Sequence, residues 1–225
     1  VRNGVRHQRA EARFVDANRA RLTSDGEEVS EVAFDHALIA VGTRPHRPAS
    51  IPFDGKRVFD SDEVLDMERL PRTLTVIGGG VIGVEYATIF SALDVPVTLV
   101  EPRETILDFV DRELVDDFIH QLRDRGVVVR LGSAVSKVTA GGNGCEVSLA
   151  DGRMVRSEMV LYAAGRAGNV GTLGLEAVGI EVDSRGRIKA DPDSFQTTVP
   201  NIYAAGDVIG FPSLASTSME QGRVA

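Results

Sequence analysis

A glycine-rich segment restricts the fold of this chain more than any other feature. Residues 74–83 read Leu-Thr-Val-Ile-Gly-Gly-Gly-Val-Ile-Gly, an apolar run followed by spaced glycines. This pattern predicts a buried strand, a tight turn and a helix whose first backbone N–H groups face outward. A second apolar run, 97–101, predicts the next strand and ends at Glu101. Together they predict a dinucleotide site in a doubly wound α/β domain.

Each glycine of the motif has a separate role. Gly78 permits the tight turn out of the strand, Gly80 lets the backbone approach a diphosphate, and Gly83 lets the helix pack closely on the strand. Glu101 is placed to accept hydrogen bonds from the adenosine ribose hydroxyls, which favours NAD. Arg103 is placed to reach a 2′-phosphate, so NADP is expected as well, although a solvent-facing arginine is an equally good interpretation.

The hydrophobic period alternates between strand and helix after residue 73. The pattern predicts strands over 74–77, 97–101 and 127–131 and helices over about 81–93 and 111–125. The apolar faces of the two helices are predicted to carry Ile82, Tyr86, Ile89, Phe90 and Leu93 in the first, and Leu114, Val115, Phe118 and Leu122 in the second. Two further strand-like runs, 145–149 and 153–163, flank an Asp-Gly turn.

The motif lies far into the chain, so other structure must surround it. Residues 1–41 read as short strands, the last of them a continuous apolar run over 37–41 that predicts a buried strand. The proline-dotted stretch from Pro45 to Pro52 indicates either a connection between domains or an ordinary surface loop. Residues 191–225 return to a strand, a glycine turn and a helix.

Composition excludes several classes of function. With 25 basic and 33 acidic residues the net charge is -8, which argues against a nucleic-acid or membrane-surface partner. No apolar run approaches the roughly 18 residues that span a bilayer, so a cytoplasmic location is expected. Cys145 is the only cysteine, which excludes an internal disulfide, and the four histidines lack metal-ligand spacing, so no metal site is expected.

Three further motifs indicate a family. Gly42-Thr43 follows an apolar strand, Ala163-Ala-Gly165-Arg166 follows another, and Gly206-Asp207 follows a third, although Asp207 alone could be a turn or cap residue. In this order the motifs resemble those of the flavoprotein disulfide reductases, the pyridine nucleotide-disulfide oxidoreductase family. That resemblance implies an FAD domain split by an inserted Rossmann-like NAD(P) domain. It implies an FAD-domain segment over 1–70, the NAD(P) domain over 71–168 and a second FAD segment over 169–225.

Within this family the chain is most similar to the soluble pyridine nucleotide transhydrogenases. The similarity lies in the segments 59–65, 80–87 and 206–215. It implies reversible hydride transfer between NADPH and NAD through FAD. A dihydrolipoyl dehydrogenase-like or mercuric reductase-like disulfide oxidoreductase is the alternative, although the former usually has histidine where Ser216 stands. A nucleotide-sensing module without turnover is the non-enzyme alternative.

The resemblance also implies the site residues. Those expected to line the nicotinamide cofactor are Gly78, Gly79, Gly80, Val81, Ile82, Gly83, Glu85, Glu101, Arg103 and Gly165. Those expected to contact FAD are Gly42, Thr43, Gly206, Asp207, Ser213, Leu214, Ala215 and Ser216, with Asp207 on the ribityl chain and a helix start near the flavin pyrimidine. The catalytic candidate is Glu85, which would pair with a lysine outside these residues; the alternative is an exposed helix residue.

The family comparison finally implies a homodimer for the full-length protein. The family's first FAD motif and its dithiol motif fall outside the 225 residues. We therefore expect these residues alone to be inactive.

Overall fold

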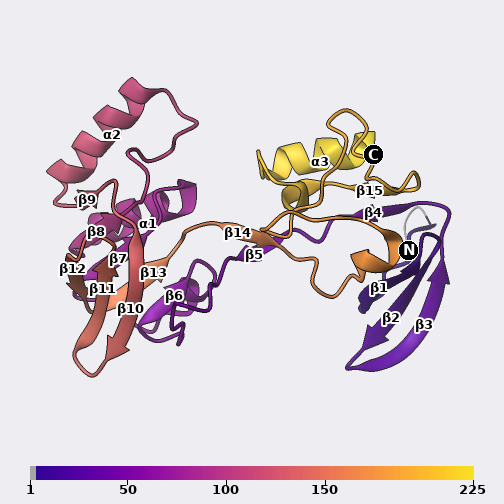
Figure 1. Cartoon of the computed structure of the whole chain (residues 1–225), viewed down its shortest axis with the longest axis horizontal. Helices are drawn as coiled ribbons and strands as arrows, with labels where there is room; N and C mark the ends of the chain where they lie inside the picture. Colours follow the sequence, from indigo (N-terminus) through magenta and orange to yellow (C-terminus); the bar gives the residue numbers. More distant parts are fainter. Residues whose placement is uncertain (1–3) are drawn as a thin grey trace. The chain divides into compact units, whose positions relative to one another are not determined.

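The computed structural model describes residues 4–225, and the chain divides into two units (Figure 1). The inserted unit comprises Pro45–Gly165, and the flanking unit comprises the chain up to Arg44 together with Arg166–Ala225. The chain passes between the units at two short strands, β5 (Thr43–Pro45) and β14 (Arg166–Gly168).

The inserted unit contains a five-stranded parallel sheet. Its order is β6-β13-β7-β8-β9, with β6 at Val58–Asp60, β13 at Met159–Tyr162, β7 at Leu74–Ile77, β8 at Val97–Val100 and β9 at Val128–Arg130. Helix α1 (Val81–Ala92) links β7 to β8, and α2 (Arg112–Asp124) lies between β8 and β9. This confirms the predicted Rossmann-like α/β fold and the predicted alternation over 74–130.

The two faces of this sheet are covered differently, because successive strand residues point to opposite sides. On one face Val76, Leu99 and Leu161 pack against α1 and α2. On the other face Val100 and Val160 pack against an antiparallel meander of β10 (Val135–Gly141), β11 (Gly144–Leu149) and β12 (Met154–Ser157). Both faces are buried, which explains the continuous apolar runs of the parallel strands.

The predicted helix faces were partly wrong. In α1 the buried residues are Gly83, Val84, Ala87 and Phe90, whereas Ile89 and Leu93 are exposed. Small side chains face the sheet there, which lets the helix axis approach β7 closely. In α2 the buried residues are Val115, Ile119 and Leu122, and Leu114 is 65% exposed.

The strand boundaries also differ from the prediction. The run 153–163 is two strands: β12 pairs with β11, and β13 enters the parallel sheet. The strands β10 and β6 were not predicted. Strand β6 enters the parallel sheet by pairing with β13, within the unit Pro45–Gly165.

The flanking unit combines a meander with a short parallel pair. The meander contains β1 (Glu11–Asp16), β2 (Arg19–Ser24) and β3 (Glu27–Ala33). Strand β4 (Ala37–Ile39) pairs in parallel with β15 (Ile202–Ala204), and α3 (Ala215–Val224) follows. Short 3-10 turns occupy Leu175–Val178 and Gly206–Ile209 in this unit and Glu63–Asp66 in the inserted unit. The apolar run over 37–41 is buried on one face only, because Leu38 is exposed while Ile39 is buried.

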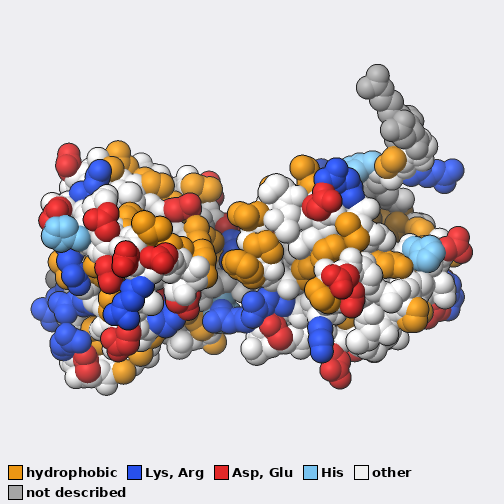
Figure 2. Space-filling view, turned by 90° about the horizontal axis from the view of Figure 1, so that it is seen from above, with side chains coloured by type: hydrophobic (Ala, Val, Ile, Leu, Met, Phe, Trp, Pro, Cys, Tyr) orange, Lys and Arg blue, Asp and Glu red, His pale blue; other side chains and the backbone are white. Residues whose placement is uncertain are grey.

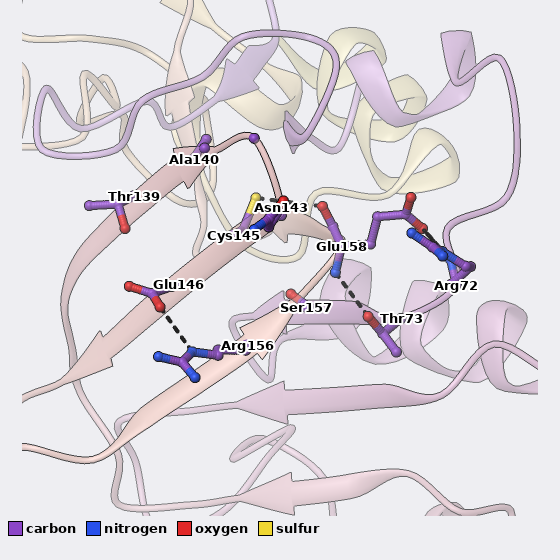
Figure 3. Close-up of a pocket in the computed structure, with 13 residues that line it drawn as sticks. Arg72, Thr73, Thr139, Ala140, Asn143, Cys145, Glu146, Arg156, Ser157 and Glu158 are labelled. Atoms are coloured by element: carbon purple, nitrogen blue, oxygen red, sulfur yellow. Dashed lines mark hydrogen bonds and ion pairs between the residues drawn. The ribbon is translucent and has the colours of Figure 1, made fainter.

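Glu158 anchors the chain between β12 and β13 to the segment that precedes β7. Its carboxylate accepts a hydrogen bond from the Arg69 guanidinium at 2.7 Å. It also accepts the Arg72 backbone N–H at 2.6 Å (Figure 3). The hydrogen bond from Arg69 lowers the pKa of Glu158 to about 2. The carboxylate therefore joins the segment that enters β7 to the point where the chain changes sheets.

Replacing Glu158 with Gln should lower the melting temperature. The folded-state pKa lies below the usual 4.5, so the stabilisation is present above pH 4.5 and is lost as the pH falls toward about 2. The difference in Tm between wild type and Glu158→Gln should therefore narrow over that range in thermal melts. Glu146→Gln is the control, since Glu146 pairs with Arg156 in the same meander at an exposed position. An equal effect of both variants at every pH would contradict the anchoring role.

Candidate dinucleotide-binding sites

The turn after β7 can be built only with glycine at two positions. Gly78 has a φ of +113°, and a Cβ there would lie 2.7 Å from the Ala163 carbonyl oxygen. A Cβ on Gly83 would lie 1.9 Å from the Gly78 carbonyl oxygen. These two glycines therefore allow α1 to start directly against the end of β7.

Gly80 differs, because it faces open space. A Cβ there would meet nothing within 4 Å, and Gly80 is the N-cap of α1. The helix has no side-chain cap and no acidic residue in its first turn. Its first N–H groups and its positive dipole end are thus available to an anion such as a diphosphate. The residues present fit a dinucleotide at this point.

Glu101 lies beside the same turn and is 2% exposed. Its Oε2 accepts the Gly79 N–H and, at 3.3 Å, an Arg103 Nη2–H. Its Oε1 accepts the Arg103 backbone N–H at 3.0 Å and the Nε–H at 2.7 Å. Burial alone would raise the pKa of Glu101, but these bonds hold it below its ordinary value. The carboxylate is therefore ionised and orders the glycine turn.

The loop after β8 returns to the glycine turn. The Leu107 N–H donates to the Gly79 carbonyl oxygen at 3.0 Å. The Arg103 Nη1 lies 2.7 Å from Asp108 Oδ2. Sequence reasoning missed Asp108, and its only signal was an acid in the segment that follows Glu101.

The other predicted nicotinamide residues lie around the same edge of the sheet. Gly165 follows β13 with a φ of +102°, and its carbonyl oxygen accepts the His46 N–H at 3.0 Å. Val81 and Glu85 are exposed and Ile82 is half-buried on α1. The inserted unit thus contains every residue predicted for the nicotinamide cofactor.

The residues predicted to contact FAD all lie in the flanking unit. Because β4 and β15 run in parallel, Gly42-Thr43 and Gly206-Asp207 follow neighbouring strand ends. The Thr43 hydroxyl accepts the Arg166 Nε–H at 2.8 Å and donates to Asp207 Oδ2 at 3.4 Å. Arg166 Nη2 also donates to the Thr43 carbonyl oxygen at 2.8 Å. Arg166, which was not assigned a role from the sequence, therefore orients Thr43 toward Asp207.

Helix α3 packs on the 3-10 turn that carries Asp207. The Gly206 N–H donates to the buried side-chain oxygen of Gln221 at 2.7 Å, which ties the turn to α3. Leu214 is the N-cap residue and makes no side-chain cap bond, and Ser213 has a φ of +49°. The first N–H groups of α3, including those of Ala215 and Ser216, therefore have no side-chain cap. They are available to a ligand group that carries negative charge.

The large hollow of the inserted unit lies away from the glycine turn. On the face of each unit seen in Figure 2, acidic and basic side chains are interspersed with apolar ones. A hollow of about 870 Å³ in the inserted unit is lined by Thr73, Cys145 and Glu158 among others (Figure 3). Thr73 precedes β7 and Gly78 follows it, so this hollow lies at the opposite edge of the sheet from the glycine turn. Among residues 4–225, no helix is long and apolar enough to cross a membrane.

The whole arrangement defines a family. The model for the pyridine nucleotide-disulphide oxidoreductases matches residues 2–222, so the chain belongs to that family. It is 46% identical to a soluble pyridine nucleotide transhydrogenase of Mycobacterium tuberculosis and 42% identical to one of Colwellia psychrerythraea, over its full length. The chain spans about half the length of these curated relatives, 49% and 48% respectively.

Solved structures agree with this assignment. LpdA from Mycobacterium tuberculosis matches 96% of the chain with a TM-score of 0.87 and 32% identity. The HOCl-induced flavoprotein disulfide reductase RclA from Escherichia coli matches 95% with a TM-score of 0.83 and 30% identity. In each case the match covers 48% of the other chain.

Two alanine substitutions should separate packing from binding in the glycine turn. Gly83→Ala should lower the free energy of unfolding by about 3 kcal/mol, because the new Cβ meets backbone. Gly80→Ala should change it by less than about 1 kcal/mol, because the Cβ enters open space. Urea denaturation of both variants measures the difference. An equal loss of unfolding free energy in both variants would contradict the difference in packing between Gly83 and Gly80.

Proposed function

We propose that the protein transfers hydride reversibly between NADPH and NAD through bound FAD. The observation that carries the proposal is the uncapped start of α1, where Gly80 opens onto free space beside the buried Glu101. Its 46% identity to a soluble pyridine nucleotide transhydrogenase supports this activity in preference to the alternatives. The proposal concerns the full-length protein, of which this chain would supply about half.

In this proposal the inserted unit binds the nicotinamide cofactors. The α1 N-terminus receives the diphosphate, and Gly78 and Gly83 keep the approach free of side chains. Gly165 and the start of α1 line the remainder of the cofactor. Glu101 orders the turn through Gly79, and a ribose hydroxyl near it would share an oxygen that already accepts N–H bonds.

The flanking unit would hold the flavin. Asp207 would bond the ribityl chain, and Arg166 and Thr43 orient its carboxylate. The uncapped N-terminus of α3 would stabilise negative charge on the pyrimidine edge by about 0.3–1 kcal/mol. When bound, FAD supplies the hydride chemistry, so the side chains named here bind and orient and need not act as acid, base or nucleophile.

Three further predictions belong to the same proposal. Glu85, exposed on α1, would pair with a lysine elsewhere in the full-length protein. The full-length protein would be a homodimer, as the family resemblance implies. A cytoplasmic location would suit a chain whose single cysteine, Cys145, is buried and whose substrates would be the nicotinamide pools.

Hydride transfer from NADPH to thio-NAD by the full-length protein tests the activity. We expect turnover, and Gly80→Ala should lower kcat/KM for both nucleotides by about tenfold, because its Cβ occupies the space of the diphosphate. Gly142→Ala is the matched control, since a Cβ there also meets nothing within 4 Å. Nucleotide binding without turnover would support the sensing alternative, and reduction of a disulfide or of mercuric ion in place of thio-NAD would support the other enzymes.

Flavin retention tests the role of the Thr43 hydroxyl. Thr43→Val removes the group that links Arg166 to Asp207, so flavin affinity of the full-length protein should fall by about tenfold. The ratio of absorbance at the flavin band to that of protein measures occupancy after dialysis. Thr198→Val, at an exposed position of the same unit, should retain its flavin. If Thr43→Val retained a full complement of flavin, the proposed role of Thr43 in flavin binding would be wrong.

A further inference from the structure

We propose that Asp108 is a specificity residue that makes the nicotinamide site prefer NAD, by pairing with the one guanidinium nitrogen of Arg103 that Glu101 leaves for a 2′-phosphate. This inference rests on the proposed function, because it concerns the cofactor choice of the same site. It also bears on the expectation that Arg103 admits NADP. In an α/β dinucleotide site the segment after the second strand faces the ribose 2′ position.

The contacts of Arg103 support this role. Its Nε and Nη2 donate to the two oxygens of Glu101, at 2.7 and 3.3 Å. Its Nη1 lies 2.7 Å from Asp108 Oδ2. Each of the three guanidinium nitrogens thus has an acidic partner, and Asp108 holds the only nitrogen that Glu101 leaves over.

The charges point in the same direction. Glu101 and Asp108 together carry two negative charges against the single positive charge of Arg103. A 2′-phosphate would therefore meet a cluster with a net charge of about -1, so NADPH should bind more weakly than NADH. The two hydroxyls of an NAD ribose carry no charge, so the same cluster does not repel them.

The ion pair between Arg103 and Asp108 can be broken without unfolding the loop that carries it. The side chains of Arg103 and Asp108 are 43% and 52% exposed, whereas Glu101 is buried. The neighbouring backbone is fastened, because the Leu107 N–H donates to Gly79 and the Gly132 N–H donates to the Arg103 carbonyl oxygen at 2.9 Å. Removing the Asp108 charge should therefore weaken the hold on Nη1 of Arg103 while the backbone of the loop stays in place.

The test compares NADH and NADPH binding to the full-length protein by fluorescence titration. In Asp108→Asn the ratio of the NADPH Kd to the NADH Kd should fall by about three- to tenfold, with the NADH Kd nearly unchanged. Asp116→Asn is the matched control, because Asp116 is a 64% exposed acid in the same unit that pairs with Arg112. Thermal melts verify that both variants fold.

A double variant distinguishes release of Arg103 from simple loss of charge. In an Arg103→Gln background, Asp108→Asn should change the ratio much less than it does in the wild type. An equal change in both backgrounds, or an unchanged ratio in Asp108→Asn, overturns the inference. If the wild-type protein binds neither nucleotide, the proposed function fails and this inference fails with it. If the wild type binds both nucleotides and turns over, but the ratio of the NADPH Kd to the NADH Kd is the same in Asp108→Asn, only the role of Asp108 is wrong.

Discussion

The contact between Gly83 of α1 and the Gly78 carbonyl oxygen is the constraint on which the candidate nicotinamide site depends. A Cβ at Gly83 would come within 1.9 Å of that oxygen, so no other residue lets the helix begin where it does. The close packing brings the α1 N-terminus to the carboxyl edge of the parallel sheet. Gly80 is then left facing open space, with uncapped N–H groups beside it.

Glu101 extends this geometry into the next strand. A carboxylate that is 2% exposed needs donors, and it obtains them from Gly79 and Arg103. The result is a turn whose backbone is ordered by a charge at the end of β8. Glu101, which the sequence predicts as a ribose ligand, thus also has a structural function, and its remaining capacity to accept hydrogen bonds is small.

The flanking unit applies similar principles with different residues. Parallel strand ends bring Thr43 and Asp207 together, and a helix without a side-chain cap follows. In each unit, parallel strands therefore end close together and a helix begins after them. This is how α/β proteins create sites for ligands with negative charge. Membership of the pyridine nucleotide-disulphide oxidoreductase family agrees with two such sites in one chain.

The sequence alone determined the glycine turn, the order of strands and helices over 74–130, and the family, because glycine spacing and hydrophobic period are local properties. It did not determine which helix residues face the sheet. The small residues Gly83 and Ala87 are buried because they let α1 pack closely on the sheet, whereas the larger Ile89 is exposed. It also did not place β6, whose three residues become a strand only by pairing with β13. The partners of Thr43 were likewise decided by tertiary structure, because Arg166 and Asp207 reach it only after distant strands have packed. The contact of Arg103 with Asp108 depends on the conformation of the loop after β8, which the sequence pattern does not specify.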